Sequence, residues 1–161
     1  MSVFQDLRTA LVNDAGMRID VMFPAQTIVI DYDALSESPE SRTRFTIAHE
    51  CAHLLLHQRI YYRDPKMKCS SSSGYQPFAA ASEGIYKETT FNRAEYQANY
   101  LGGALLMPRA TFVAIFNNLT PGSWHDLSYR QKKDVVSALS EKFETSRQAV
   151  GVRIRHLGLV A

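Results

Sequence analysis

The chain has 161 residues, of which 45% are hydrophobic and 21% are charged, and its formal net charge at pH 7 is +2. This length suits one domain, residues 1–161, that buries a core without disulfides or a metal for stability. The composition is near the average of globular proteins, and the small charge excludes nucleic-acid binding driven by net charge alone.

The N-terminal segment predicts a cytoplasmic protein. It lacks the basic start, the continuous apolar run and the cleavage site of a signal peptide, and the chain contains no apolar run of about 18 residues. The two cysteines, Cys51 and Cys69, are expected to be thiols in a reducing compartment. We therefore expect neither membrane association nor a disulfide framework.

Three elements are predicted before residue 38. Apolar residues at helical spacing predict an amphipathic helix over residues 3–13, ended by Asn13 and Gly16. Residues 17–24 and 26–33 are short segments rich in β-branched residues, so they predict two strands that form an edge hairpin.

A long helix is predicted next, from Ser38 as the cap and Pro39 as the first helical residue to about Arg59. From Phe45 onward it is apolar on nearly every side, which indicates a central, buried helix. It nevertheless contains two histidines and a glutamate, within the sequence RFTIAHECAHLLLH of residues 44–57. Buried polar groups need partners, so this segment is a candidate functional site.

Residues 60–90 have the composition of a long loop, which is either a lid or binding loop or a connector. A second, mostly apolar helix is predicted from Phe91 to Pro108, and its Gly102-Gly103 pair indicates close packing. Pro108 also starts a further helix that extends to about Asn117.

Two amphipathic helices are predicted at the C-terminus, over residues 131–143 and 147–156, with Thr145 and Gln148 spaced as a capping box. Their order resembles a helix-turn-helix. We therefore divide the domain into a catalytic core over residues 1–120 and a helix-turn-helix-like subregion over residues 125–161.

The sequence HECAH is an H-E-x-x-H motif. His49 and His53 are four residues apart, so on a helix they project from one face and can bind one zinc ion through imidazole nitrogens. Glu50 lies about 100° further round the helix, where its carboxylate could take a proton from metal-bound water. The alternative is that both histidines are core residues with hydrogen-bond partners in the protein.

A catalytic zinc site usually has three protein ligands. His57 is excluded as the third because it lies about 12 Å from His49 along a straight helix; it is expected beside a ligand or at the surface. Glu95 is the better candidate, and Asn99, one turn further along, could accept the N–H of a ligand histidine and fix its tautomer. The local alternative for Glu95 is a capping box with Asn92.

These segments resemble the ImmA/IrrE metallopeptidases, whose members join segments like FTIAHECAHLLLH and EYQANYLGGALLMP in this order. The resemblance covers roughly residues 20–110, and the C-terminal helices also look like the family's tail. It implies that His49, His53 and Glu95 bind one Zn²⁺ per chain and that Glu50 is the general base.

The resemblance also implies a zinc-dependent endopeptidase that hydrolyses a peptide bond in a specific protein partner. In the family this partner is commonly a helix-turn-helix transcriptional repressor of a mobile element, a stress response or a toxin-antitoxin system. Cys51 and Ala52 depart from the larger apolar residue and glycine that the family often has, but neither touches a ligand; Cys51 is expected to pack as a small hydrophobic residue. Besides the zinc, a tyrosine could stabilise the oxyanion, and the sequence does not choose among Tyr75, Tyr86 and Tyr96.

Two rival functions remain open at this stage. The first is a DNA-binding regulator, because residues 125–161 carry seven Lys or Arg against four Asp or Glu, and Arg147, Arg153 and Arg155 could face phosphate. Such helical pairs more often serve in core packing, so nucleic acid is not the favoured partner. The second is a protein-binding module without catalysis.

The predicted fold class is α+β, with a zincin-like minimal metallopeptidase core. In this core a small, mostly antiparallel sheet is packed on one side by the two metal-bearing helices, and a helical C-terminal tail follows.

Overall fold

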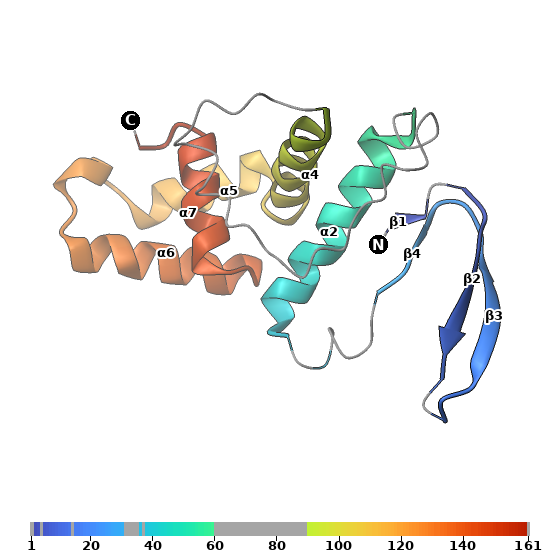
Figure 1. Ribbon diagram of the computed structural model, residues 1–161. Coiled ribbons are helices and arrows are strands. Elements are labelled where there is room, and N and C mark those ends of the chain that lie inside the picture. The colour runs from blue at the N-terminus through green and yellow to red at the C-terminus, as the bar shows by residue number, and fades with distance from the viewer. Residues whose placement is uncertain are drawn as a thin grey trace.

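The computed structural model describes six parts of the chain: residues 2–3, 5–13, 15–30, 36, 38–59 and 90–160. Within these parts, four short strands precede five α-helices, which confirms the α+β fold class (Figure 1). Of the loop predicted over residues 60–90, residues 60–89, which include Cys69, Tyr75 and Tyr86, lie outside the described residues. In the described part of the chain, no helix has both the length and the apolar character that a membrane crossing requires.

The four strands form an antiparallel ribbon at the N-terminus. β1 (Ser2–Val3) pairs with β4 (Thr27–Ile28), and β2 (Leu7–Val12) pairs with β3 (Arg18–Phe23). In every pair of both sheets, the two residue numbers have the same sum, so the two short sheets share one register. Between them lies a break in the pairing, after β1 on one side of the ribbon and after β3 on the other. The β2–β3 part extends away from the helices (Figure 1).

The helix predicted over residues 3–13 is therefore wrong, because these residues belong to β1 and β2. The reason is a tight turn that brings β3 alongside β2. In this turn the Asn13 side-chain oxygen accepts hydrogen bonds from the backbone N–H groups of Ala15 and Met17, at 3.1 and 2.8 Å. Gly16 has a φ of 76°, which glycine adopts without strain. Asn13 and Gly16 thus make a hairpin turn instead of ending a helix.

The predicted edge hairpin between residues 17–24 and 26–33 is also wrong in its pairing. β3 pairs with β2, and β4 pairs with β1 across the break in the ribbon. Two hydrogen bonds hold this break: the backbone N–H of Ala25 donates to the Asp6 carboxylate at 2.8 Å, and that of Gln26 donates to the carbonyl oxygen of Val3 at 2.7 Å. The chain therefore crosses from β3 to β4 without turning back on β3.

Two long helices follow, α2 (Glu40–Leu56) and α4 (Thr90–Leu106). Pro39 is the N-cap of α2 and Ser38 makes no capping hydrogen bond, so α2 starts one residue later than predicted. α2 contacts β1 and β4 and lies between the strands and α4 (Figure 1). It is central but not buried all round, since the side chain of Leu55 is 68% exposed.

α2 and α4 pack with their backbones close together because small residues form the contact. A Cβ atom added at Gly102 would lie 3.1 Å from the backbone nitrogen of His49 and 3.2 Å from its Cα. Gly103, in contrast, has nothing within 4 Å of such an atom, so the predicted close packing holds for Gly102 alone. Four alanines of the two helices are at most 7% exposed: Ala48, Ala52, Ala94 and Ala98.

The C-terminal part is helical, as predicted. Its helices are α5 (Arg109–Leu119), α6 (Tyr129–Phe143) and α7 (Arg147–His156), with a single 3₁₀ turn (Trp124–Asp126) between α5 and α6. They bury a common apolar core made of Met107, Phe112, Phe116, Val135, Leu139, Phe143, Val150 and Ile154.

The capping box predicted at Thr145 and Gln148 is wrong. Ser146 caps α7, its side chain accepting from the backbone N–H of Ala149 at 3.1 Å. Thr145 is buried instead, and its hydroxyl donates to the sulfur of Met107 at 3.7 Å.

One buried arginine connects α7 to the end of α4. Arg153 is 4% exposed, and its Nε donates to the carbonyl oxygen of Met107 at 3.0 Å. Arg153 therefore cannot face phosphate on a nucleic acid, which removes one of the three arginines considered for that role.

A surface ion pair also connects α2 with α6. Arg44, near the start of α2, pairs with Glu144 at the end of α6. Because both partners are exposed, this pair contributes little stability.

We expect Gly102→Ala to lower the free energy of unfolding by about 1 to 3 kcal/mol, because the added methyl group would meet the backbone of α2. Gly103→Ala is the matched control on the same helix. It should be neutral, or stabilise by up to about 1 kcal/mol through helix propensity. Urea unfolding followed by circular dichroism measures both, and equal effects would contradict the close approach at Gly102.

Candidate metal centre

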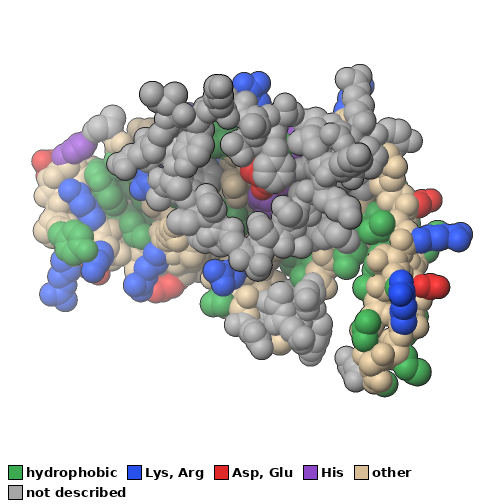
Figure 2. Space-filling model, viewed as in Figure 1, with side chains coloured by type: hydrophobic (Ala, Val, Ile, Leu, Met, Phe, Trp, Pro, Cys, Tyr) green, Lys and Arg blue, Asp and Glu red, His purple; other side chains and the backbone are tan. Residues whose placement is uncertain are grey.

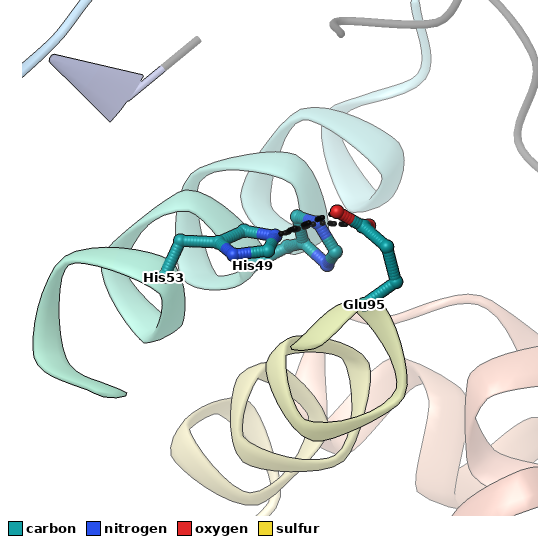
Figure 3. A group of neighbouring side chains, drawn as sticks. All are labelled: His49, His53 and Glu95. Carbon is teal, nitrogen blue, oxygen red and sulfur yellow. Dashed lines mark hydrogen bonds and ion pairs between the residues drawn. The ribbon is translucent and has the colours of Figure 1, made fainter. Parts of the chain in front are cut away.

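Three side chains from α2 and α4 converge on one point (Figure 3). The Nε2 atoms of His49 and His53 are 3.0 Å apart, and each lies 3.3 Å from a different carboxylate oxygen of Glu95, Oε2 for His49 and Oε1 for His53. Among the described residues, these three are the one group of three or more His, Cys, Asp or Glu side chains positioned to hold a metal ion, with ligand atoms all within 4.8 Å of one another. The structure thus brings together the three residues that the sequence proposes as ligands.

The distances between the donor atoms can be compared with those around a single tetrahedral metal ion such as zinc. Two ligand atoms that each lie about 2.0 to 2.1 Å from a tetrahedral ion are about 3.3 to 3.4 Å apart. The separations of 3.0, 3.3 and 3.3 Å are each close to such an edge, but the two imidazoles face different oxygens of Glu95. With one ligand atom taken from each residue, all three atoms lie within 4.8 Å of one another, which is close enough for a single ion to contact both imidazoles and the carboxylate.

The centre is closed on one side and open on the other. His53 is completely buried, whereas the side chains of His49 and Glu95 are 17% and 31% exposed. Figure 2 shows acidic and histidine side chains next to each other near the middle of the face seen in Figure 1. Water or a substrate could therefore reach the three side chains from the side of His49 and Glu95.

Asn99 orients the ring of His49. Its side-chain oxygen, Oδ1, lies 3.1 Å from Nδ1 of His49. An amide oxygen only accepts hydrogen bonds, so Nδ1 of His49 carries the proton and Nε2 presents a lone pair to Glu95 and His53. This is the tautomer that a metal requires.

His57 lies beside a ligand, and its surface alternative is excluded, because the residue is 1% exposed. Its Nδ1 is 3.0 Å from Nδ1 of His53, and its Nε2 is 3.0 Å from the side-chain oxygen of Gln97. The sequence argument considered only the distance between His57 and His49, and so it missed the contact between His57 and His53. The spacing of four residues between His53 and His57 was the signal for this contact, whereas nothing in the sequence singles out Gln97.

The electrostatics of the centre keep Glu95 ionised. Burial raises the pKa of its carboxyl group. In the metal-free protein this is outweighed by the hydrogen bonds that Nε2 of His49 and His53 donate when their rings are charged, and by that charge, so the pKa falls from 4.5 to about 2. The pKa of His57 is lowered, chiefly because burial disfavours its charged form. A carboxylate that stays charged next to two imidazoles is well suited to a divalent cation.

The other candidate residues lie outside this cluster. Glu50 is 7% exposed and follows His49 on α2, and Cys51 is half-buried on the same helix. Tyr96 follows Glu95 on α4, but the residue is 49% exposed and the centre of its ring lies 6.3 Å from that of His156 on α7.

Two imidazoles and a carboxylate on a pair of packed helices could hold a metal ion, and hydrolytic metal centres use this donor set. The chain belongs to the Peptidase_M78 family of metallopeptidases: the family model described as Peptidase_M78, IrrE N-terminal-like domain, matches residues 13–155. This match confirms the predicted membership in the ImmA/IrrE metallopeptidases and includes the C-terminal helices. Comparisons with curated proteins and with solved structures give no match.

The depressed pKa of Glu95 predicts a pH dependence for the metal-free protein. Its folded pKa of about 2 lies below the ordinary value of 4.5, so the unfolded chain binds the proton first as the pH falls. The stability that Glu95 contributes should be complete above pH 4.5 and decline between pH 4.5 and about 2. Urea unfolding of wild type and Glu95→Gln across this range measures it. A difference between the two that does not change with pH would show that the carboxylate is not held by the histidines.

Proposed function

We propose that the protein is a zinc-dependent endopeptidase that hydrolyses a peptide bond in a specific protein partner. The observation that carries this proposal is the convergence of His49, His53 and Glu95, whose ligand atoms lie within 4.8 Å of one another, in a chain that belongs to a metallopeptidase family. A peptidase acts on a protein substrate, so the partner is a polypeptide.

The donor set supports zinc. Two imidazole nitrogens and one carboxylate oxygen suit zinc, and three protein ligands leave a position for water or substrate. When both imidazoles are neutral and carry their proton on Nδ1, the lone pairs of these atoms repel one another at separations of 3.0 to 3.3 Å unless a cation lies among them. The three residues would therefore hold the ion, His53 from the closed side of the centre and Glu95 from the exposed side.

When bound, zinc supplies a Lewis acid that polarises the peptide carbonyl and lowers the pKa of a water ligand to about 7. The residues of the chain do the rest. Glu50 accepts the proton of the attacking water and donates it to the leaving amine nitrogen. Asn99 keeps Nε2 of His49 unprotonated through the hydrogen bond at Nδ1. His53, completely buried, closes the site to water from the side of the helix pair.

The partner that we propose is a helix-turn-helix transcriptional repressor of a mobile element, a stress response or a toxin-antitoxin system. The support for this is the resemblance to the ImmA/IrrE family, in which such partners are common. Cleavage would take place in the cytoplasm, where a repressor meets its DNA.

We propose that residues 125–161 belong to the same domain as the catalytic core and stabilise it. Arg153 and Thr145 both bond to Met107, which directly follows α4, and the apolar faces of α6 and α7 pack on α5. A basic surface for DNA is less well supported, because Arg153 is buried and Arg147 donates to the hydroxyl of Ser137 at 2.9 Å.

Metal analysis tests the site. We expect about one zinc per chain in the wild type by elemental mass spectrometry, and little or none in His49→Ala and Glu95→Ala, because each removes one of three ligands. His125→Ala is the control, since His125 is exposed and distant from the cluster in sequence. A wild type that binds no zinc after incubation with it would overturn the proposed function.

Proteolysis tests the mechanism. Purified protein incubated with the repressor encoded next to it should produce one discrete cut. Glu50→Gln should slow this cut by about 10²- to 10⁴-fold, because the general base is lost, while zinc content stays at the wild-type level. Persistence of the cut in Glu50→Gln at an undiminished rate would contradict the role of Glu50.

A further inference from the structure

A chain of hydrogen bonds leads from the metal centre back to α4. His53 contacts His57 through the Nδ1 atoms of both rings, at 3.0 Å, and Nε2 of His57 contacts Oε1 of Gln97, also at 3.0 Å. The two histidines are 0% and 1% exposed, so neither ring exchanges these partners freely with water. Gln97 is exposed and follows Glu95 by two residues on α4.

The amide oxygen fixes where the protons lie along this chain. Because Oε1 of Gln97 only accepts, Nε2 of His57 must donate to it. A neutral His57 then has a lone pair at Nδ1, which accepts the proton of Nδ1 of His53. His53 is left with an unprotonated Nε2, and this is the atom that faces Glu95 at 3.3 Å.

With the amide of Gln97 in the opposite orientation, each of these protons would lie on the other nitrogen of its ring. The amide nitrogen of Gln97 would donate to Nε2 of His57, whose Nδ1 would then donate to Nδ1 of His53. His53 would carry its proton on Nε2, at the point where the lone pairs of His49 and Glu95 converge. A proton on that atom excludes a metal ion, because a ligating imidazole must offer a lone pair there.

We propose that His57 and Gln97 are positioning residues that hold His53 in the tautomer with Nε2 free for the metal, and that the Gln97 oxygen sets the direction of the chain. This inference rests on the metal site of the proposed function. In this proposal α4 provides the ligand Glu95 and also the residue Gln97 that orients His53. Asn99 fixes the tautomer of His49 directly, and Gln97 fixes that of His53 through His57.

The test uses two substitutions at Gln97, which is exposed and therefore tolerates change. Gln97→Met keeps the length of the side chain but removes the acceptor. Gln97→Glu keeps an oxygen that only accepts at neutral pH, so it preserves the direction of the chain. Gln148→Met, at an exposed glutamine on α7, is the control for the loss of a surface amide.

The first readout is the zinc dissociation constant, measured by competition with a chromophoric chelator at pH 7. Gln97→Met should weaken binding by about tenfold, at the lower end of the effect of removing a group that orients a ligand. Gln97→Glu and Gln148→Met should bind at least as tightly as wild type. Wild-type affinity in Gln97→Met would overturn the proposal.

The second readout is the tautomer of His53 in the metal-free protein, observed from the ¹⁵N chemical shifts of its ring at a pH where the ring is neutral. Wild type and Gln97→Glu should show the proton on Nδ1, and Gln97→Met should show a mixture. A proton on Nε2 of His53 in wild type would also overturn the proposal.

The two readouts separate the inference from the proposed function. If wild type binds no zinc, the proposed function fails, and the ring shifts still decide whether Gln97 directs the protons. If wild type binds zinc and Gln97→Met binds it equally well, the metal site stands and the role of Gln97 is lost.

Discussion

The close approach of two helix backbones is the constraint on which the candidate metal centre depends. Gly102 of α4 lies against the backbone of α2 at His49, where a single methyl group would be in contact at 3.1 Å. The carboxylate of Glu95 reaches both histidines across the helix pair because the helix backbones are this near. The small residues between α2 and α4 thus help to decide where the three candidate ligands lie, although none of these small side chains is itself a donor.

Much of the site could be predicted because its signals are local. The spacing of His49 and His53 needs only a helix to place both imidazoles on one face, and α2 provides it. Glu95 and Asn99 were found by the same argument on α4. The order of the helices from α2 to α7 also follows from caps, prolines and apolar periodicity, all of which act within a few residues.

The parts that could not be predicted depend on contacts between distant segments. Residues 7–12 have apolar positions at helical spacing, but an antiparallel partner delivered by the turn after them makes the strand more favourable. The role of His57 required the position of Gln97, forty residues away in sequence, within hydrogen-bonding distance. Arg153 looked like a surface cation by composition, yet the carbonyl oxygen of Met107 gives it a buried partner.

The ligands of the centre come from two helices that are joined through a long stretch of chain, roughly 40 residues between His53 and Glu95. An ion bound by both helices would cross-link the two ends of this stretch of chain, and such cross-links stabilise the folded state most when the stretch is long. Since the unfolded chain has no assembled site, the free energy of unfolding would rise with the concentration of free ion. Scarcity of the ion would then reduce the amount of folded protein in the cell, so that metal supply would set the abundance of the peptidase as well as its rate.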